Sequence, residues 1–417
     1  MKRRVAFLIL TVLPHIAAGD LTSGPQRLTQ QHPADYSFVS DARSATIPFR
    51  FLGNHIYFPA EIGGRTFQFG LDTGGMNILA ASVAKAIGAR SVGSAQATGV
   101  GEHQVTVSFA KIPAVSLDSK LTIRNQVFVV VPLSGTSVVE GTALDGVVGY
   151  ELLKRFVIRI NYANHQLQIL RPADFDARSA GTAVPFTFDG RMPQVAGSLD
   201  GLAGRFDIDT GSRDALSINS PFVKAHQSLL QTYAPTARTV VGWGAGGAAY
   251  GRLARAHEFR MGDVAVMCPV VELSTEAEGT DAEASVAGVI GNEILSRFTV
   301  TFDYPKQLVY LHLNSNYGKP FSYDRAGMWV NRLNRNLVIE SVMAGSPAQR
   351  TGLHEGDLIV SVDGKEVASV ELAEFRRMLA DSPVGTKVAL RVLRAGRTLS
   401  MTVTLRDLIP RCAEMKN

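Results

Sequence analysis

One short sequence occurs twice in this chain and restricts what the chain can fold into. An apolar, strand-like run ends in Asp72-Thr73-Gly74, and a second such run ends in Asp209-Thr210-Gly211. Glycine after a strand indicates a tight turn or a close backbone approach, so each Asp would be held on a rigid element. Two such turns on related halves of a chain could bring two carboxylates together, which is a recurrent device for acid–base chemistry.

The repeat extends beyond these two turns. The flanking motifs recur in the same order in both halves: Ile47-Pro48-Phe49 with Val184-Pro185-Phe186, Val147-Val148-Gly149 with Val289-Ile290-Gly291, and Asn161-Tyr162 with Asp303-Tyr304. The Pro precedes the Asp by 24 residues in both halves, and the Asn or Asp of the last motif follows the Gly by 12 residues in both. A match of this length and order predicts two related lobes, residues 45–175 and 180–316.

Short apolar runs predominate inside both lobes and predict a mainly β structure. Strands are expected at 105–109, 127–131, 157–160, 167–170 and 308–313, and short helices at 81–88, 150–155, 221–231 and 292–297.

Each lobe also has a Gly-rich segment, at residues 98–103 and 242–251. Their flanking β-branched residues predict hairpin tips, which are either ordinary flexible hairpins or mobile flaps over a cleft. A nucleotide-binding loop does not fit the second segment, because no strand–loop–helix context surrounds it. The flap candidates are Gly99, Gly101, Gly242, Trp243 and Tyr250.

The N-terminus is typical of a secretory signal peptide, with three basic residues, an apolar run at 5–13 and small residues at 17–19. We expect residues 1–19 to direct export, so that the protein is periplasmic or secreted. It would contact a membrane only if this segment stayed uncleaved as an anchor. Residues 20–44 are polar and predict a flexible leader.

Charge and cysteine content restrict the partners. Without the predicted signal peptide, 39 Lys and Arg face 37 Asp and Glu, and no basic stripe predicts binding to nucleic acid. Export permits a disulfide between Cys268 and Cys412, but one buried and one exposed thiol fit the sequence equally well. Neither the cysteines nor the nine histidines have a metal-ligand spacing, so we expect no metal and no cofactor.

The pattern changes after about residue 316. Residues 337–339 are strand-like, and 355–364 form a strand closed by an Asp-Gly turn. Residues 370–380 form an amphipathic helix, and 387–393 and 398–405 form two strands joined by an Arg-Ala-Gly turn. We predict a compact α/β unit at 322–406, followed by a tail at 407–417.

The two lobes resemble aspartic peptidases of the pepsin and retropepsin type. That family's pattern is an apolar pair, Asp-Thr-Gly, a flap hairpin, then an apolar pair and Gly, and both halves contain it. The resemblance implies two pseudo-symmetric, retropepsin-like acid-protease β lobes with a central cleft. It also implies that Asp72 and Asp209 are the catalytic residues of an aspartic endopeptidase.

In that family two carboxylates about 3 Å apart share one proton, because both cannot ionise cheaply. The resemblance implies that the ionised member takes a proton from water while the other donates to the scissile carbonyl oxygen. The two pKa values belong to the pair.

The residues around the pair have roles that the resemblance also implies. Thr73 and Thr210 would lock the two loops together through hydroxyl-to-backbone hydrogen bonds, while Gly74 and Gly211 would let the backbone approach each carboxylate. Ser212 could donate to the outer oxygen of Asp209. Gly75 cannot do this for Asp72, so we predict that Asp209 ionises more readily.

Residues 322–406 resemble a PDZ domain, through Gly345-Ser346-Pro347-Ala348, Gly352-Leu353 and Gly356-Asp357-Leu358-Ile359. The carboxylate-binding loop would fall at Gly327-Met328-Trp329-Val330, where Trp329 replaces the family's second Gly. The resemblance implies a module that adds an extended peptide as a strand beside its helix, to capture a substrate or a partner protein or to dock on the lobes.

The sequence thus predicts an exported aspartic endopeptidase that acts on peptide or protein substrates and carries a PDZ module. One alternative is a peptide-binding adaptor whose lobes form a catalytically silent scaffold. Another is a protein that binds a non-peptide ligand in the cleft. Loss of peptide hydrolysis in Asp72→Asn and in Asp209→Asn would favour the first of these three.

Overall fold

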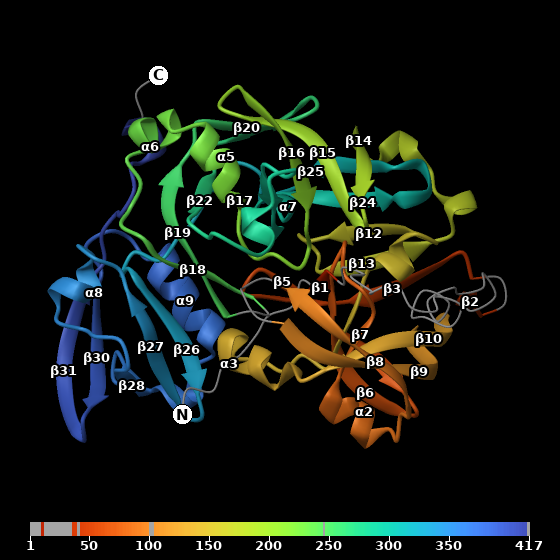
Figure 1. The fold of residues 1–417 in the computed structure, drawn as a ribbon, viewed down its shortest axis with the longest axis horizontal. Coiled ribbons are helices and arrows are strands. Elements are labelled where there is room, and N and C mark those ends of the chain that lie inside the picture. Colours follow the sequence, from red (N-terminus) through yellow and green to blue (C-terminus); the bar gives the residue numbers. More distant parts are fainter. Residues whose placement is uncertain (1–9, 12–35, 40–41, 100–103, 245–246, 415–417) are drawn as a thin grey trace.

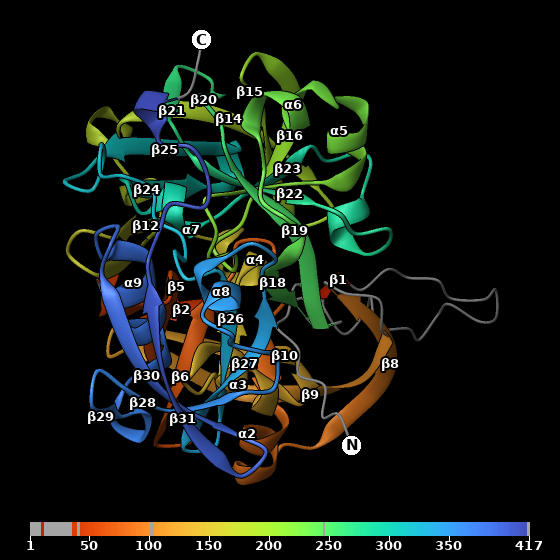
Figure 2. The same cartoon turned by 90° about the vertical axis from the view of Figure 1, so that its left-hand side faces the viewer.

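The structure is a computed structural model that describes residues 10–11, 36–39, 42–99, 104–244 and 247–414. Within these residues the strands form sheets of 10, 15 and 6 strands. Two β lobes lie against each other, and a smaller α/β unit packs beside both of them (Figure 1, Figure 2). The mainly β character and the separate C-terminal unit agree with the sequence.

The first sheet belongs to the N-terminal lobe. Its strand order is β1 (Leu10–Thr11), β8 (Ser91–Gly99), β9 (Gln104–Asp118), β10 (Leu121–Val131), β7 (Ile78–Ala80), β11 (Gly146–Val148), β6 (Arg65–Leu71), β5 (His55–Ile62) and β4 (Arg50–Leu52), with β2 (Tyr36–Phe38) paired to β10.

The second sheet joins the two halves of the chain. Its order is β18 (Thr239–Gly244), β19 (Gly247–Arg255), β22 (Val270–Ser274), β17 (Leu216–Ile218), β23 (Gly288–Ile290), β16 (Leu202–Ile208), β15 (Met192–Leu199), β14 (Thr182–Asp189), β25 (Leu308–Leu313), β24 (Phe298–Asp303), β12 (Val157–Asn161), β13 (Gln166–Leu170) and β3 (Ser44–Pro48). The strands β20 (Glu258–Met261) and β21 (Val264–Met267) branch from β15. The antiparallel pair β12–β24 links the lobes.

The sequence repeat is also a repeat of strand pairing. In the first half β6 runs parallel to β11, β11 antiparallel to β7, and β7 parallel to β10. In the second half β16, β23, β17 and β22 have the same three relations in the same order. The two halves therefore place their Asp-Thr-Gly turns at equivalent ends of equivalent strands.

Short helices cap these strands: α2 (Ala81–Ala86), α3 (Thr136–Glu140), α4 (Tyr150–Leu153), α5 (Ser220–Ala225), α6 (Ser228–Tyr233) and α7 (Asn292–Leu295). The single helix predicted at 221–231 is wrong. The chain forms α5 and α6 instead, because His226 leaves the helical region with φ −122° and ψ 59°.

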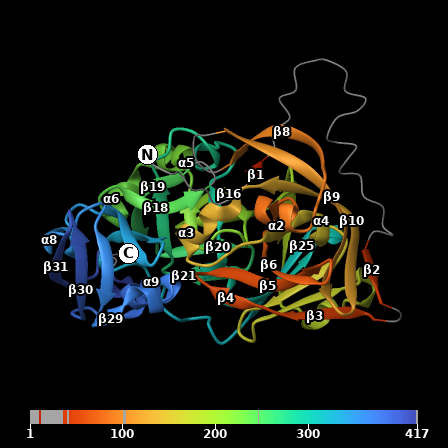
Figure 3. The same ribbon diagram turned by 90° about the horizontal axis from the view of Figure 1, so that it is seen from below.

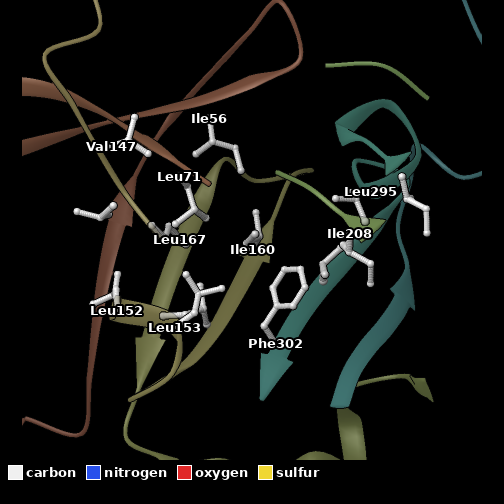
Figure 4. Packing of buried hydrophobic residues seen from close by; sticks show 14 of the residues in the cluster. Ile56, Leu71, Val147, Leu152, Leu153, Ile160, Leu167, Ile208, Leu295 and Phe302 are labelled. Carbon is white, nitrogen blue, oxygen red and sulfur yellow. The ribbon is translucent and has the colours of Figure 1, made fainter. Parts of the chain in front are cut away.

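One hydrophobic core runs through both lobes. It includes Leu71 and Ile208, the residues directly before Asp72 and Asp209, and Figure 4 shows them with Leu153 and Leu295 from the helices that follow Gly149 and Gly291. Buried apolar contacts on this scale fix a backbone firmly. Each Asp therefore follows a strand end that is anchored in the core.

The C-terminal unit has its own core and lies at one side of the lobes (Figure 3). It contains β26 (Met328–Leu333), β27 (Asn336–Val342), β28 (Leu358–Val362), β29 (Lys365–Glu366), β30 (Lys387–Arg394), β31 (Arg397–Thr404), α8 (Pro347–Arg350) and α9 (Leu372–Asp381). The amphipathic helix predicted at 370–380 is α9, and it buries Leu372, Phe375 and Leu379 as expected.

The predicted signal peptide lies outside the described residues except for Leu10–Thr11, which pair with Gly99 and Thr98 of β8. The predicted leader at 20–44 needs a correction at its end. Residues 36–38 form β2, and Tyr36 is buried with its hydroxyl donating to Gln126 Oε1 at 2.6 Å. No helix among the described residues is long and apolar enough to cross a membrane.

The two cysteines form a disulfide, which decides between the alternatives that the sequence left open. Cys268 and Cys412 lie 5.7 Å apart between Cα atoms. Ile409 of the predicted tail is buried in the core of the lobes. The tail therefore returns from the C-terminal unit and is fastened to the second lobe.

Candidate functional site

The two Asp residues lie at the ends of β6 and β16. Each backbone N–H continues the parallel pairing of its strand, from Asp72 to Val148 O at 3.1 Å and from Asp209 to Ile290 O at 3.0 Å. The apolar pairs before Gly149 and Gly291 thus form the strands that hold the two turns.

The structure brings the two carboxylates to one space. A methyl group on Gly211 would lie 3.0 Å from Asp209 Oδ1 and 3.2 Å from Asp72 Oδ2. Asp209 is fully buried, and only 4% of Asp72 is exposed. The pair is therefore close, facing and shielded from water.

The two threonines connect the turns. The Thr73 hydroxyl donates to Ile208 O at 2.7 Å and accepts from the Thr210 N–H at 3.1 Å. The Thr210 hydroxyl donates to Leu71 O and accepts from the Thr73 N–H, both at 3.1 Å. These are the hydroxyl-to-backbone bonds that the resemblance implies, and they make the two turns one unit.

Four glycines give the turns their close packing. A Cβ on Gly149 would overlap the carbonyl oxygen of Asp72, and one on Gly291 would overlap the carbonyl oxygen of Asp214. The N–H groups of Gly74 and Gly75 donate to Asp72 Oδ1 at 3.1 and 2.7 Å. A Cβ on Gly75 would lie only 2.5 Å from the Asp72 carboxyl carbon, so no larger residue fits there without a shift.

Burial governs the electrostatics of the pair. It raises the pKa of Asp72 well above its usual value, and the neighbouring Asp209 raises it further, against the N–H groups of Gly75 and Gly74. Burial also raises the pKa of Asp209, to about 6, against the N–H of Gly211. Burial and mutual repulsion thus favour a pair that keeps one proton at mildly acidic pH, so that one carboxyl group is protonated while the other is ionised.

The Ser212 hydroxyl has a different partner from the one that the resemblance implies. Among the residues that the structure describes, none donates a hydrogen bond to Asp209 Oδ2, and Asp209 Oδ1 accepts from the Gly211 N–H at 2.6 Å. The Ser212 hydroxyl instead accepts from the Asp214 N–H at 3.4 Å. Ser212 is therefore turned toward its own loop rather than toward the carboxylate.

The predicted flap residues do not lie together in the structure. Gly242 and Trp243, on β18, line a cavity of about 100 Å³ together with Gly211 and Ser212. Tyr250 instead places its ring 4.1 Å from the Arg238 guanidinium. Gly99 ends β8, and Gly101 lies outside the described residues.

The predicted carboxylate-binding loop runs directly into a strand. Gly327 has φ +74°, and Met328, Trp329 and Val330 begin β26, the edge strand of its sheet. Arg376 of α9 donates to Val330 O at 2.6 Å, so a side chain already occupies a position where an added strand would pair.

The C-terminal unit touches the second lobe at this strand. The Trp329 ring stacks on Trp243, with centroids 6.5 Å apart. A cavity of about 450 Å³ lies between the unit and the lobes, with Thr239, Val241 and Met328 among the residues that line it.

An ion cluster that was not predicted from the sequence lies beside the pair. Arg213, four residues after Asp209, forms an ion pair with buried Glu140, and Glu140 Oε2 lies 3.6 Å from His55 Nε2. Burial lowers the pKa of His55, and the charge of Arg213 lowers it further. The position of Arg213 directly after Asp-Thr-Gly-Ser was the available signal, but its partners lie far away in the sequence.

Comparisons with known proteins match two separate stretches of the chain. Residues 58–152 match the family model of aspartyl proteases, and residues 338–394 match that of PDZ domains. The first stretch contains Asp72 and Gly149.

Curated relatives match a shorter part. The Serine protease Do-like HtrB of Bacillus subtilis is 36% identical over 80 residues, which are 19% of this chain and 17% of that protein. The periplasmic pH-dependent serine endoprotease DegQ of Escherichia coli is 36% identical over 88 residues, 21% and 19%. The periplasmic serine endoprotease DegP of Salmonella typhimurium is 33% identical over 73 residues, 18% and 15%. The chain thus spans less than a fifth of the length of these relatives.

These names correct the predicted function. The sequence predicted an exported aspartic endopeptidase acting through an Asp dyad, whereas the relatives are named serine endoproteases. They support a protease, but not the aspartic type. A matched stretch of 88 residues is shorter than the 137 positions between Asp72 and Asp209, so none of these three comparisons covers both carboxylates.

The site combines buried, facing carboxylates on interlocked turns with an edge strand in a separate C-terminal unit. Residues 58–152 are thus similar to aspartyl proteases, and residues 338–394 are similar to PDZ domains.

Proposed function

We propose that this chain is a protease, a hydrolase that binds a peptide or protein substrate. The names of the curated relatives and the two matched family models support this class. Two of those relatives are named periplasmic, and the basic and apolar start of the chain fits export to the same compartment. The PDZ domain is proposed to bind a peptide or a partner protein along β26, where Gly327–Val330 begin the edge strand.

We further propose that Asp72 and Asp209 are the residues on which hydrolysis depends. The observation that carries this is the position of two buried carboxylates within 3.2 Å of one point, on turns that share four hydrogen bonds. The equal pairing of β6–β11 and β16–β23 supports two retropepsin-like lobes with the site between them.

A serine-type hydrolysis is the second candidate, and the names of the relatives favour it. The two candidates differ in a measurable way. Serine-type hydrolysis requires a nucleophilic hydroxyl that a phosphonylating reagent modifies, whereas hydrolysis by a carboxylate pair leaves no covalent intermediate.

The experiment follows hydrolysis of an unfolded protein by the full chain between pH 3 and 8. We expect Asp72→Asn and Asp209→Asn each to lower kcat/KM at least about a hundredfold while the fold is kept. Asp200→Asn is the matched control, because Asp200 accepts hydrogen bonds from Tyr233 and from two backbone N–H groups in another loop.

The outcomes separate the candidates. Loss in both Asp variants, with no effect of a fluorophosphonate, supports the carboxylate pair. Inactivation by the fluorophosphonate, with a labelled serine found by mass spectrometry and active Asp variants, supports serine-type hydrolysis. If the wild type cleaves no substrate better than a variant with both Asp72→Asn and Asp209→Asn, neither candidate holds, and a binding protein remains.

A further inference from the structure

In each Asp-Thr-Gly turn, the carbonyl oxygen of the peptide unit between Thr and Gly also accepts a hydrogen bond. The buried Tyr304 hydroxyl donates to Thr73 O at 2.7 Å. The N–H of the same peptide unit, on Gly74, donates to Asp72 Oδ1 at 3.1 Å. One peptide unit thus connects the tyrosine to the carboxylate.

The second turn has a corresponding chain with one more member. The Tyr162 hydroxyl donates to Asn292 Oδ1 at 2.6 Å, and Asn292 Nδ2 donates to Thr210 O at 2.7 Å. The N–H of that unit, on Gly211, donates to Asp209 Oδ1 at 2.6 Å. A peptide unit again connects a buried phenol to a carboxylate.

The two tyrosines occupy equivalent places in the repeat, but each supports the turn of the other half. Tyr162 follows β12 of the first half and reaches the Asp209 turn, while Tyr304 follows β24 of the second half and reaches the Asp72 turn. The pairing of β12 with β24 sets this exchange. Tyr162 is 2% exposed and Tyr304 is 3% exposed, so an unpaired hydroxyl at either place would be costly.

We propose that Tyr304, and Tyr162 acting with Asn292, are positioning residues that orient and electrostatically tune the two carboxylates through the peptide units between them. The proposal rests on the proposed function of Asp72 and Asp209. A hydrogen bond to a carbonyl polarises its amide, which makes the N–H on the other side a stronger donor. A stronger N–H donor favours the ionised form of the carboxylate that accepts from it.

The tyrosines remain donors under the conditions of the reaction. Burial raises the pKa of Tyr304 well above its usual value, and Asp72 and Asp209 raise it further. Burial also raises the pKa of Tyr162 well above its usual value.

Other charged groups also face the pair and set the background of any titration. The charge of Asp209 acts on Asp72, and the charge of Asp214 acts on Asp209. Asp207 interacts with Asp209, and Arg213 interacts with Asp214. None of them donates to the Thr73 or Thr210 carbonyl in the hydrogen bonds described above. A phenylalanine at a tyrosine position therefore changes the chain of hydrogen bonds without changing these charges.

The test compares Tyr304→Phe and Tyr162→Phe with wild type in the full chain. We expect kcat to fall about tenfold in each, with KM within about twofold, because both hydroxyls are buried and hydrogen-bonded inside the protein. Weaker N–H donation raises the pKa of the carboxylate concerned. Because the two pKa values belong to the pair, Tyr304→Phe and Tyr162→Phe should each move the limbs of the pH–rate profile to higher pH.

Tyr233→Phe is the matched control. Tyr233 is a buried tyrosine, and its hydroxyl donates to Asp200 at a distance of 2.5 Å rather than to either Asp-Thr-Gly turn. It should cost stability without moving either limb. A ¹³C NMR titration of labelled Asp carboxyl groups gives a second readout that needs no activity. Upward shifts for Asp72 in Tyr304→Phe and for Asp209 in Tyr162→Phe would support the proposal.

Unchanged carboxyl titrations in folded Tyr→Phe variants would overturn it, as would a limb shift of equal size in Tyr233→Phe. Failure of the proposed function has a different signature. In that case Asp72→Asn and Asp209→Asn keep full activity, while the NMR titration still reports on the hydrogen-bond chain.

Discussion

The two Asp-Thr-Gly turns have the same backbone and different neighbours. Both follow a core strand, both are held by a parallel strand that ends in an apolar pair and Gly, and both exchange hydrogen bonds through Thr73 and Thr210. Yet Asp72 Oδ1 accepts from two glycine N–H groups, whereas Asp209 Oδ1 accepts from Gly211.

The side chains around the turns differ at matching positions. Asp207 stands where the first half has Gly70, and Asn292 stands where it has Tyr150. A repeat that keeps its backbone hydrogen bonds and changes its side chains gives two identical functional groups unequal environments. In a pair that shares one proton, unequal environments bias which of the two carboxyl groups holds that proton.

Substitution of the two glycines beneath the turns should cause the largest losses of stability, and the loss should be similar in the two halves. Gly149→Ala and Gly291→Ala each press a methyl group into a backbone carbonyl oxygen of the neighbouring turn. We expect a loss of about 4 kcal/mol in the free energy of unfolding for each, measured by urea denaturation. Gly242→Ala is the control, since its methyl group would lie 3.7 Å from Ala249 Cβ. A small loss of stability at only one of the two glycines would show that the two turns are not supported in the same way.

The threonine interlock should be the next most sensitive feature. Thr73→Val leaves Ile208 O and the Thr210 N–H without their partner, and Thr210→Val does the same to Leu71 O and the Thr73 N–H. Each variant should lose about 3 kcal/mol. The double variant should lose less than the combined single losses, because each hydroxyl is held by the other loop. Fully additive losses would show that the loops are held independently.

Asp207 offers a test of how the halves differ. Burial raises the pKa of Asp207 to about 7. The folded state therefore binds more protons than the unfolded state between about pH 4 and pH 7, and stability falls as the pH rises through this window. Asp207→Asn should remove on the order of 2 kcal/mol of that fall, measured by urea denaturation at pH 4.5 and 7.5. Glu61→Gln, at an exposed residue of β5 in the other lobe, should leave it unchanged.

The sequence predicted the parts of the site that repeat or are local. The two Asp-Thr-Gly turns, the Gly149 and Gly291 motifs and the PDZ-like strands all have signals within a few residues. Contacts between distant side chains had none. Tyr304 and Thr73 are 231 positions apart, and Arg213 meets Glu140 across the two halves. The matching Tyr162 and Tyr304 were visible as a repeat, but no spacing shows that each reaches the opposite turn.

Ser212 should show the smallest effect, and it separates two explanations of the unequal pair. The sequence suggested that its hydroxyl stabilises ionised Asp209, whereas the hydroxyl accepts from the Asp214 N–H at 3.4 Å, and none of the described residues donates to Asp209 Oδ2. Ser212→Ala should therefore cost about 0.5 kcal/mol and leave both limbs of the pH–rate profile in place. A shift of the acidic limb to higher pH in Ser212→Ala would show that the Ser212 hydroxyl stabilises ionised Asp209, as the sequence predicted. An unchanged profile would assign the asymmetry to burial, to the backbone N–H groups and to the charge that each carboxylate imposes on the other.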